Sequence, residues 1–390
     1  MILDNFTEYL DKKTLPAKYS CELCTANNQW KMNRILILLQ TLLCSIWVSC
    51  SCSTDTKTAG PGGNNVHTPD VPEVPAEPTP AKSGLVFGYV QPAAWNFEQC
   101  FPTVQWDCLT HILPSFCYVQ EDGTLDSSVL DQYIKQLRDE ARKHGIKVIP
   151  SFRSTGGKDY FSKAVATPEL REKLADNITR YVGKYGLDGV DIDFEEYERI
   201  AANRDNLFDL FRRIREKMDR SLLMTSAVNP GKWLKDKGYG AEWHTYFDYI
   251  NVMSYDRKNG DTPVQTASYE QYVEDMVFCH ETLDIPYHKL LGGLPFYGFS
   301  WDNITGTDNA GGITFNSIMN YYRDRIEDAK DRDNIGDTYY NGHRTIRKKC
   351  EHALETGMGG VMIWQLFQDS TRPDECLLRT VGGIMLQNNQ

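Results

Sequence analysis

Several familiar binding signatures are missing from this chain of 390 residues. Lys and Arg number 42 against 53 Asp and Glu, so the formal net charge is −11 and no basic surplus is available for nucleic acid. No G-x-G-x-x-G turn follows the first strand-like run, and no G-x-x-x-x-G-K-[ST] sequence occurs, which leaves phosphate-binding folds without support. A neutral ligand is compatible with these absences.

A disulfide or metal framework is also missing. The 11 cysteines follow no framework spacing, and the "CELC" pair at residues 21 to 24 has no second pair to complete a metal site. Cys100 and Cys108 either form a bridge in an oxidising compartment or remain buried thiols. We expect neither a bound metal nor a cofactor.

The apolar run within residues 32 to 50, "MNRILILLQTLLCSIWVSC", is shorter than the roughly 20 residues of a membrane-spanning helix, and Gln40 interrupts it. Its basic start and its end in small residues are typical of a bacterial export signal. "WVSC" followed by polar residues resembles a lipoprotein processing site, so Cys50 is the predicted lipidation site and Cys52 the second choice. An ordinary cleaved signal and an uncleaved anchor remain open.

These features predict an exported protein that a lipid anchor holds to a membrane of the cell envelope, on the periplasmic or outer-membrane surface. Residues 1 to 31 are interpreted as an upstream extension. Residues 51 to 83 are rich in Pro, Gly, Thr and acidic residues and nearly free of large apolar ones, which is typical of a disordered, extended linker. The folded domain is therefore expected at residues 84 to 390.

Within this domain, apolar runs rich in β-branched and aromatic residues alternate with segments of helical pattern. In residues 167 to 186, Thr167 is a predicted N-cap, Pro168 lies in the first turn and Gly186 follows the end. Eight strand candidates are found, at 85–90, 109–116, 146–152, 189–195, 222–228, 249–255, 290–297 and 359–366. This pattern favours a single (β/α)8 barrel, with a small insertion after the seventh strand, over a doubly wound open sheet. A monomer is expected.

The most unusual strand candidate is "GVDIDFE" at residues 189 to 195. Residues two apart share one face of a strand, so Asp191, Asp193 and Glu195 point one way and the apolar residues between them the other. Crowding and partial desolvation raise the proton affinity of at least one such carboxyl, which is what a general acid requires. Two other interpretations stay open: a solvated acidic face, and a divalent metal site, although the EF-hand spacing is absent.

The surrounding motifs resemble a known family. "DGVDIDFE", Asp188 to Glu195, matches the D-G-x-D-x-D-x-E signature of glycoside hydrolase family 18, the chitinase-like enzymes, at every fixed position. "MSYD" at 253 to 256, "GGLPFYG" at 292 to 298 and "GGVMIWQL" at 359 to 366 resemble the family's sixth, seventh and eighth strands. The resemblance covers about residues 84 to 378 and implies the same barrel.

It also implies hydrolysis of β-linked N-acetylglucosamine with retention, the acetamido group of the substrate being the nucleophile. By this resemblance Glu195 is the general acid and base, Asp193 orients the acetamido group, Asp191 holds Asp193, and Tyr255 donates a hydrogen bond to the acetamido oxygen. The implied substrate-binding residues are Trp364, as an apolar floor, with Asp256, Met253, Tyr297 and Asp188. A packing role is the alternative for Trp364, Met253 and Tyr297.

Some features depart from the family pattern or lie outside it. The third strand of the family runs straight into S-x-G-G, whereas "SFRSTGG" places that motif at Ser154 to Gly157, three residues late. Glu196 and Glu198 are expected to be loop residues. Trp95, Trp106 and Trp301 either extend the cleft or pack in loops. The alternative functions are an endo-β-N-acetylglucosaminidase acting on N-glycans, cleavage of peptidoglycan, and a non-catalytic lectin on the same barrel.

Overall fold

The computed structural model describes residues 83–230, 239–258, 262–302, 304 and 311–386. The predicted upstream extension (1–31), the export signal (32–50) with Cys50, and all of the linker (51–83) but its last residue lie outside these residues. Those three assignments therefore remain predictions.

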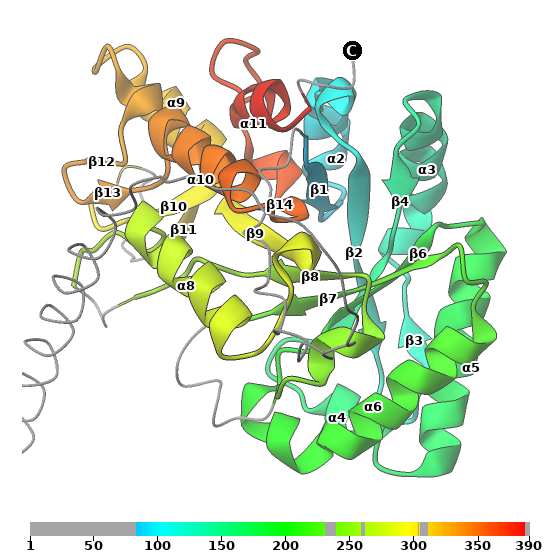
Figure 1. Cartoon of the computed structure of the whole chain (residues 1–390). Helices are drawn as coiled ribbons and strands as arrows, with labels where there is room; N and C mark the ends of the chain where they lie inside the picture. The colour runs from blue at the N-terminus through cyan, green and yellow to red at the C-terminus, as the bar shows by residue number, and fades with distance from the viewer. Residues whose placement is uncertain (1–82, 231–238, 259–261, 303, 305–310, 387–390) are drawn as a thin grey trace, which may run out of the picture. The chain divides into compact units, whose positions relative to one another are not determined.

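Parallel strands form a closed barrel at the centre of the described domain (Figure 1). The strands β1, β14, β9, β8, β7, β6, β5 and β2 are neighbours in that order, and β2 pairs with β1 to complete the circle. Their bounds are β1 Leu85–Val90, β2 His111–Val119, β5 Ser151–Ser154, β6 Gly189–Asp193, β7 Leu223–Val228, β8 Tyr249–Val252, β9 Leu290–Pro295 and β14 Gly360–Trp364. The predicted (β/α)8 barrel is confirmed, with every predicted strand in place.

Two short strands accompany the barrel. β4 (Lys147–Val148) pairs with the start of β2 and precedes β5 within the third predicted strand, while β3 (Leu125–Asp126) forms an antiparallel hairpin with the end of β2. The α-helices of the described residues are α2 (Phe97–Cys100), α3 (Ile134–Lys143), α4 (Tyr160–Ala164), α5 (Pro168–Tyr185), α6 (Ile200–Lys217), α8 (Tyr269–Glu281), α9 (Phe315–Tyr322), α10 (His343–Glu355) and α11 (Leu377–Met385). Figure 1 shows the longer ones arranged around the strands.

Helix α5 begins and ends as its sequence predicts. The Thr167 side chain accepts a hydrogen bond from the amide of Leu170, Pro168 occupies the first turn, and Gly186 at the C-cap has a φ of 59°. That left-handed conformation favours glycine because it has no Cβ. The face of α5 that carries Leu174, Ile178 and Val182 is buried against the barrel.

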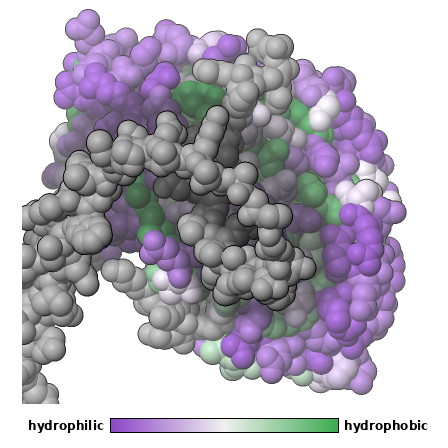
Figure 2. Space-filling model, viewed as in Figure 1, coloured by the Kyte–Doolittle hydropathy of each residue, from purple (hydrophilic) through white to green (hydrophobic). Residues whose placement is uncertain are grey.

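The core has two parts because barrel strands are covered on both sides. Val190, Ile192 and Phe194 on β6 and just after it lie in the larger cluster, between strands and helices. A smaller cluster, which includes Phe87, Leu113 and Met362, fills the inside of the barrel. Figure 2 shows mainly hydrophilic residues along the rim of this view of the molecule. This is expected where helices turn their polar sides to water.

An insertion follows the seventh barrel strand, as predicted. It contains β10 (Tyr297–Ser300), β11 (Gly311–Thr314), β12 (Asn334–Ile335) and β13 (Thr338–Tyr339), which form an antiparallel sheet in the order β11-β10-β13-β12, together with α9. This sheet continues directly from β9, so it stands at the carboxyl end of the barrel strands, where β/α barrels place their sites.

The described part of the chain has no helix long and apolar enough to cross a membrane. Its six cysteines, including Cys100 and Cys108, are free thiols. Within the same residues, no group of three or more His, Cys, Asp or Glu side chains is arranged to hold a metal ion.

Candidate active site

The three acidic side chains of β6 rise through the barrel in steps of increasing exposure. Asp191 is 0% exposed, Asp193 is 3% exposed, and the side chain of Glu195, beyond the end of the strand, is 32% exposed. The period of two in the strand sets their common direction, because the intervening apolar residues face the helices. The charges therefore lie inside the barrel, and the solvated acidic face considered from the sequence is wrong.

Asp191 accepts hydrogen bonds from uncharged donors on four strands. Ser151 Oγ and Tyr89 Oη lie 2.7 and 2.8 Å from its Oδ2, while Thr225 Oγ1 and Asn251 Nδ2 lie 2.6 and 3.1 Å from its Oδ1. Burial raises the pKa of Asp191, and these hydrogen bonds oppose that rise. Asp191 thus ties β1, β5, β7 and β8 to β6 at the base of the site.

Asp193 lies one step further along the barrel and is incompletely satisfied. Its Oδ1 is buried without a hydrogen-bond partner among the described residues, while its Oδ2 lies 3.7 Å from Nη1 of Arg153. Burial and the nearby charge of Glu195 raise the pKa of Asp193 well above the ordinary aspartate value, and the charge of Arg153 opposes them. A buried acceptor without a partner is costly in a folded protein and marks a place where a ligand donor would be bound well.

Glu195 stands between two hollows. On the inner side it lines a cavity of about 230 Å³, and on the outer side a more open hollow of about 740 Å³. The inner cavity is lined by Tyr89, Arg153, Asp193, Glu195, Ala227, Met253, Tyr255, Asp256 and Trp364. Glu195 therefore borders both hollows.

Tyr255 and Asp256 follow the end of β8 and form another wall of the cavity. Removal from water, together with the surrounding carboxylates, raises the pKa of Tyr255 well above its usual value, so its hydroxyl keeps its proton and stays a donor. Tyr297 does not line the cavity but donates a hydrogen bond to Oδ1 of Asp256 from behind. Helix α8 supports this segment, because Asp275 accepts a hydrogen bond from Ser254 Oγ at 2.6 Å and pairs with Arg257.

Trp364, the last residue of β14, is the aromatic surface of the cavity. Its ring stacks on Phe116 with a centroid separation of 5.7 Å and tilts against Tyr89 at 5.4 Å. It is only partly buried, so one part of the indole packs and another faces the cavity. Met253 lines the same space. Part of Trp364 therefore packs, while its contact with a ligand stays a prediction.

The structure places two of the residues considered from the sequence away from the cavity. Asp188 lies at the amino end of β6, where its Oδ2 accepts a hydrogen bond from the amide of Val148 at 2.8 Å, so it joins strands at the opposite end from Glu195. This corrects its assignment as a substrate-binding residue. Trp106 precedes β2 and is buried against Phe101 and His144, which is loop packing.

The other two tryptophans differ from Trp106. Trp95 is 81% exposed in the loop after β1, at the end of the barrel where Glu195 lies. Trp301 follows β10 and contacts the rings of Phe299 and Tyr339 within the insertion.

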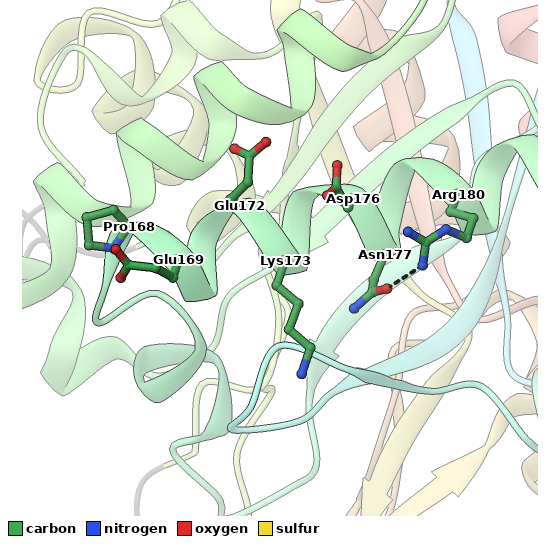
Figure 3. Close-up of a pocket in the computed structure, with 7 residues that line it drawn as sticks. All are labelled: Pro168, Glu169, Glu172, Lys173, Asp176, Asn177 and Arg180. Carbon is green, nitrogen blue, oxygen red and sulfur yellow. Dashed lines mark hydrogen bonds between the residues drawn. The ribbon is translucent and has the colours of Figure 1, made fainter.

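A hollow elsewhere on the domain lacks the features of a reaction site. It has a volume of about 640 Å³, lies along α5 and is lined by Pro168, Glu169, Glu172, Lys173, Asp176, Asn177 and Arg180 (Figure 3). Its residues are exposed or half-buried, and several pair with neighbours, as Arg180 Nη1 does with Asn177 Oδ1 at 2.9 Å. None of these groups converges on a buried carboxyl.

Sequence reasoning missed several residues of the site, above all Arg153. Nη2 of Arg153 lies 2.7 Å from Oε2 of Glu195, and its guanidinium lies 4.7 Å from the centre of the Phe116 ring. Ser151, rather than Ser154 of the expected motif, contacts Asp191. A weak signal was present, because Ser151 and Asn251 are isolated polar residues within apolar strand runs.

Glu196 lies in the loop after β6, as expected, and it also anchors that loop. Its carboxylate accepts hydrogen bonds from the amides of Phe161 and Ser162, both at 3.0 Å, and from the hydroxyls of Ser154 and Ser162. It therefore fixes the chain next to Glu195 to the end of β5 and the first turn of α4.

Comparison with known proteins agrees with this geometry. The model of the glycosyl hydrolases family 18 matches residues 86–369, which is most of the described domain. The chain therefore belongs to glycosyl hydrolase family 18.

Solved structures similar to the chain include chitinases. A chitinase from Bacteroides thetaiotaomicron is 40% identical, with a TM-score of 0.74 over 79% of this chain and 98% of that chain. A family 18 chitinase from the chitin utilization locus of Flavobacterium johnsoniae is 26% identical, with a TM-score of 0.67 over 79% of this chain and 95% of that one.

Among curated proteins, the "Probable chitinase 10" of Drosophila melanogaster is 28% identical over 72% of this chain. "Chitotriosidase-1" of Mus musculus is 25% identical over 57% of this chain. The match spans only 15% of the fly protein and 58% of the mouse protein.

Proposed function

We propose that the chain is a retaining glycosidase that cleaves β-1,4-linked N-acetylglucosamine in chitooligosaccharides, with Glu195 as general acid and base. The observation that carries the proposal is the stepped arrangement of Asp191, Asp193 and Glu195 beneath a cavity with an aromatic wall. The likeness to a chitinase that is 40% identical over 98% of its length supports the choice of substrate.

The unpartnered Oδ1 of Asp193 fits the N–H of an acetamido group. A sugar that rests on Trp364 would bring its acetamido group between Asp193 and Tyr255, with the N–H toward the carboxylate and the carbonyl oxygen toward the phenol. Held in this way, the carbonyl oxygen attacks the anomeric carbon while Glu195 protonates the leaving oxygen. The negative charge of Asp193 stabilises the cationic oxazolinium intermediate that results.

Glu195, now ionised, then removes a proton from water, which opens the intermediate with overall retention. Asp191 does not reach the sugar in this scheme; it holds the strands that position Asp193. Asp256 and Met253, which line the cavity, are proposed contacts to the sugar chain. The exposed Trp95 is another, since an aromatic face suits the C–H surface of a pyranose. Tyr297 acts through Asp256, to which it donates a hydrogen bond.

The test is turnover of chitotetraose, an N-glycopeptide and peptidoglycan fragments by the wild type and by Glu195→Gln. Glu172→Gln on α5 is the matched control, since the same change is made on the outer surface. We expect cleavage of chitotetraose to fall by at least about a hundredfold in Glu195→Gln and to be unchanged in the control.

Other outcomes would change the assignment. Cleavage of the N-glycopeptide alone would identify an endo-β-N-acetylglucosaminidase, and cleavage of the peptidoglycan fragments alone would shift the substrate to the cell wall. Binding of these sugars without turnover by any variant would identify a lectin. Equal turnover by wild type and Glu195→Gln would remove Glu195 as the acid.

We also propose, from the sequence, that the protein is exported as a monomer and anchored through a lipid on Cys50, with residues 51 to 83 as the tether. Mass spectrometry of the membrane-bound protein should find Cys50 as a lipidated first residue. Release of the Cys50→Ala variant from the membrane would support the anchor, and a first residue other than Cys50 without lipid would contradict it.

A further inference from the structure

One cation reaches both carboxylates at the mouth of the barrel. Arg153 lies on β5, with its side chain 21% exposed and its guanidinium against the face of Phe116. Nη2 lies 2.7 Å from Oε2 of Glu195, and Nη1 lies 3.7 Å from Oδ2 of Asp193. The planar guanidinium presents donors in a fixed fork, so a single side chain sets the separation and direction of two acids.

The same stretch of chain holds the residue after Glu195. Ser154 lies next to Arg153, and Phe161 and Ser162 lie in α4; all three donate to the carboxylate of Glu196. The stretch from β5 to α4 therefore holds two successive residues beyond β6. Arg153 pairs with Glu195, and the three donors bind Glu196. Glu195 is held from one side of the cavity rather than left free at its mouth.

The charge around this contact is otherwise mainly negative or neutral. Of the nine described residues that line the cavity, Arg153 is the only cation. The titratable groups around the pair are Tyr89 on β1, Asp191 on β6, Tyr239 after β7, Tyr255 and Asp256 after β8, and Tyr297 on β10, with Lys258 beside Asp256. On the outer side of Glu195 lie Glu121, Lys158, Asp159, Lys163, Glu196, Glu198 and Arg199, among which Lys163 pairs with Glu121 and Asp159, and Arg199 with Asp159.

We propose that Arg153 is a positioning residue, which holds Glu195 beside Asp193 and sets the lower limit of the pH range over which the site is active. The inference deepens the proposed function, on which it rests for the reaction. In this role Arg153 contacts the general acid and not the sugar. The role explains why a pocket for a neutral sugar contains a guanidinium.

The direction of the pH effect follows from the sign of the charge. Burial and the charge of Glu195 raise the pKa of Asp193, and the positive charge of Arg153 lowers it. Without that charge Asp193 keeps its proton to higher pH, and a protonated Asp193 no longer stabilises a cationic intermediate. Because an opposite charge at this range shifts a carboxyl by about one pH unit or more, the acid limb of kcat/KM should move upward by about one unit in Arg153→Met.

The experiment is the pH profile of kcat/KM on chitotetraose for the wild type, Arg153→Met and Arg153→Lys. Arg213→Met is the matched control, because Arg213 on α6 makes ion pairs with Asp209 and Glu172 far from the cavity wall. We expect the acid limb to move up by about one unit in Arg153→Met, to stay near the wild-type position in Arg153→Lys, which keeps the charge, and not to move in the control. Arg153→Lys should still lose roughly tenfold in kcat/KM, because a lysine lacks the fork.

A fall in activity in Arg153→Met with an unmoved acid limb would overturn the proposal, since it would mean a structural role only. If Arg153→Met does not fold, the test rests on Arg153→Lys. A kcat/KM of this variant equal to that of the wild type would overturn the positioning role.

A second readout separates this inference from the proposed function. Carboxyl ¹³C NMR titration of Asp193, assigned with Asp193→Asn, requires no turnover. An upward shift of the Asp193 titration in Arg153→Met supports the positioning role of Arg153, even if the wild type cleaves no N-acetylglucosamine substrate. An unmoved titration overturns that role, even if the wild type cleaves such a substrate.

Discussion

Carboxylates occupy two contrasting regions of this domain. On α5 and α6 they face arginine and lysine: Asp209 accepts hydrogen bonds from Arg171 Nε at 2.7 Å and Arg213 Nε at 2.9 Å. Partial burial alone would raise the pKa of Asp209, but these guanidinium groups lower it. In the barrel, Asp191 has four uncharged donors and Asp193 a buried oxygen with no donor among the described residues, and the pKa of each is raised.

The difference shows what each arrangement is suited to do. A carboxylate paired with cations near the surface stays ionised and adds modestly to stability. A carboxylate buried among phenols, hydroxyls and other acids binds its proton more tightly and leaves acceptor capacity unused, at a cost in stability. The first kind holds helices together, and the second kind is available for proton transfer and for ligands.

The largest effect on stability is expected for Asp191→Ala. The change leaves donors from four strands buried without their acceptor, so the free energy of unfolding should fall by about 4 kcal/mol, measured by urea denaturation. Turnover should fall as well, because Asp193 loses its support. A loss no greater than that of the surface variant below would mean that the four strands do not depend on Asp191.

A smaller loss, of about 1 kcal/mol, is expected for Asp209→Ala in the network between α5 and α6. Salt screens such pairs, so the loss should shrink when NaCl is raised from 0.05 to about 1 M. Activity on chitotetraose should be unchanged. A loss that is independent of salt would show that packing, and not charge pairing, is what Asp209 contributes.

A change of similar size but opposite sign is expected for Asp193→Asn. A carboxyl whose native pKa is raised destabilises the fold when it is ionised, above its native pKa, and this penalty is gone below the unfolded value near about 4. The variant should therefore be more stable than the wild type by about 1 kcal/mol at pH 8, with the gain vanishing toward pH 4, while its turnover falls steeply. Thermal unfolding across this pH range measures it, and destabilisation at pH 8 would contradict it.

Local features of the fold were predictable because they depend on near neighbours. The caps of α5 at Thr167 and Gly186 and the alternation along β6 follow from short stretches of sequence. Closure of the barrel followed from the number of strands and the helical segments between them. Each of these rests on a repeated pattern rather than on one contact.

The contacts of the site were not predictable in the same way, because they join residues far apart in the chain. The partners of Asp191 lie 34 to 102 residues away in sequence. Arg153 was missed because β5 has only four residues, too few to show an alternation. Asp188 was placed in the substrate site by its motif, although the direction of β6 puts it at the opposite end from Glu195.

The central claim is that Glu195 and Asp193 act on a sugar whose own acetamido group is the nucleophile. The most direct test is ¹H NMR of the first products formed from chitotetraose by the wild type, before the anomers equilibrate. We expect the new reducing end to appear as the β-anomer, and Glu195→Gln to form none at a comparable rate. Initial release of the α-anomer, or undiminished formation of product by Glu195→Gln, would contradict it.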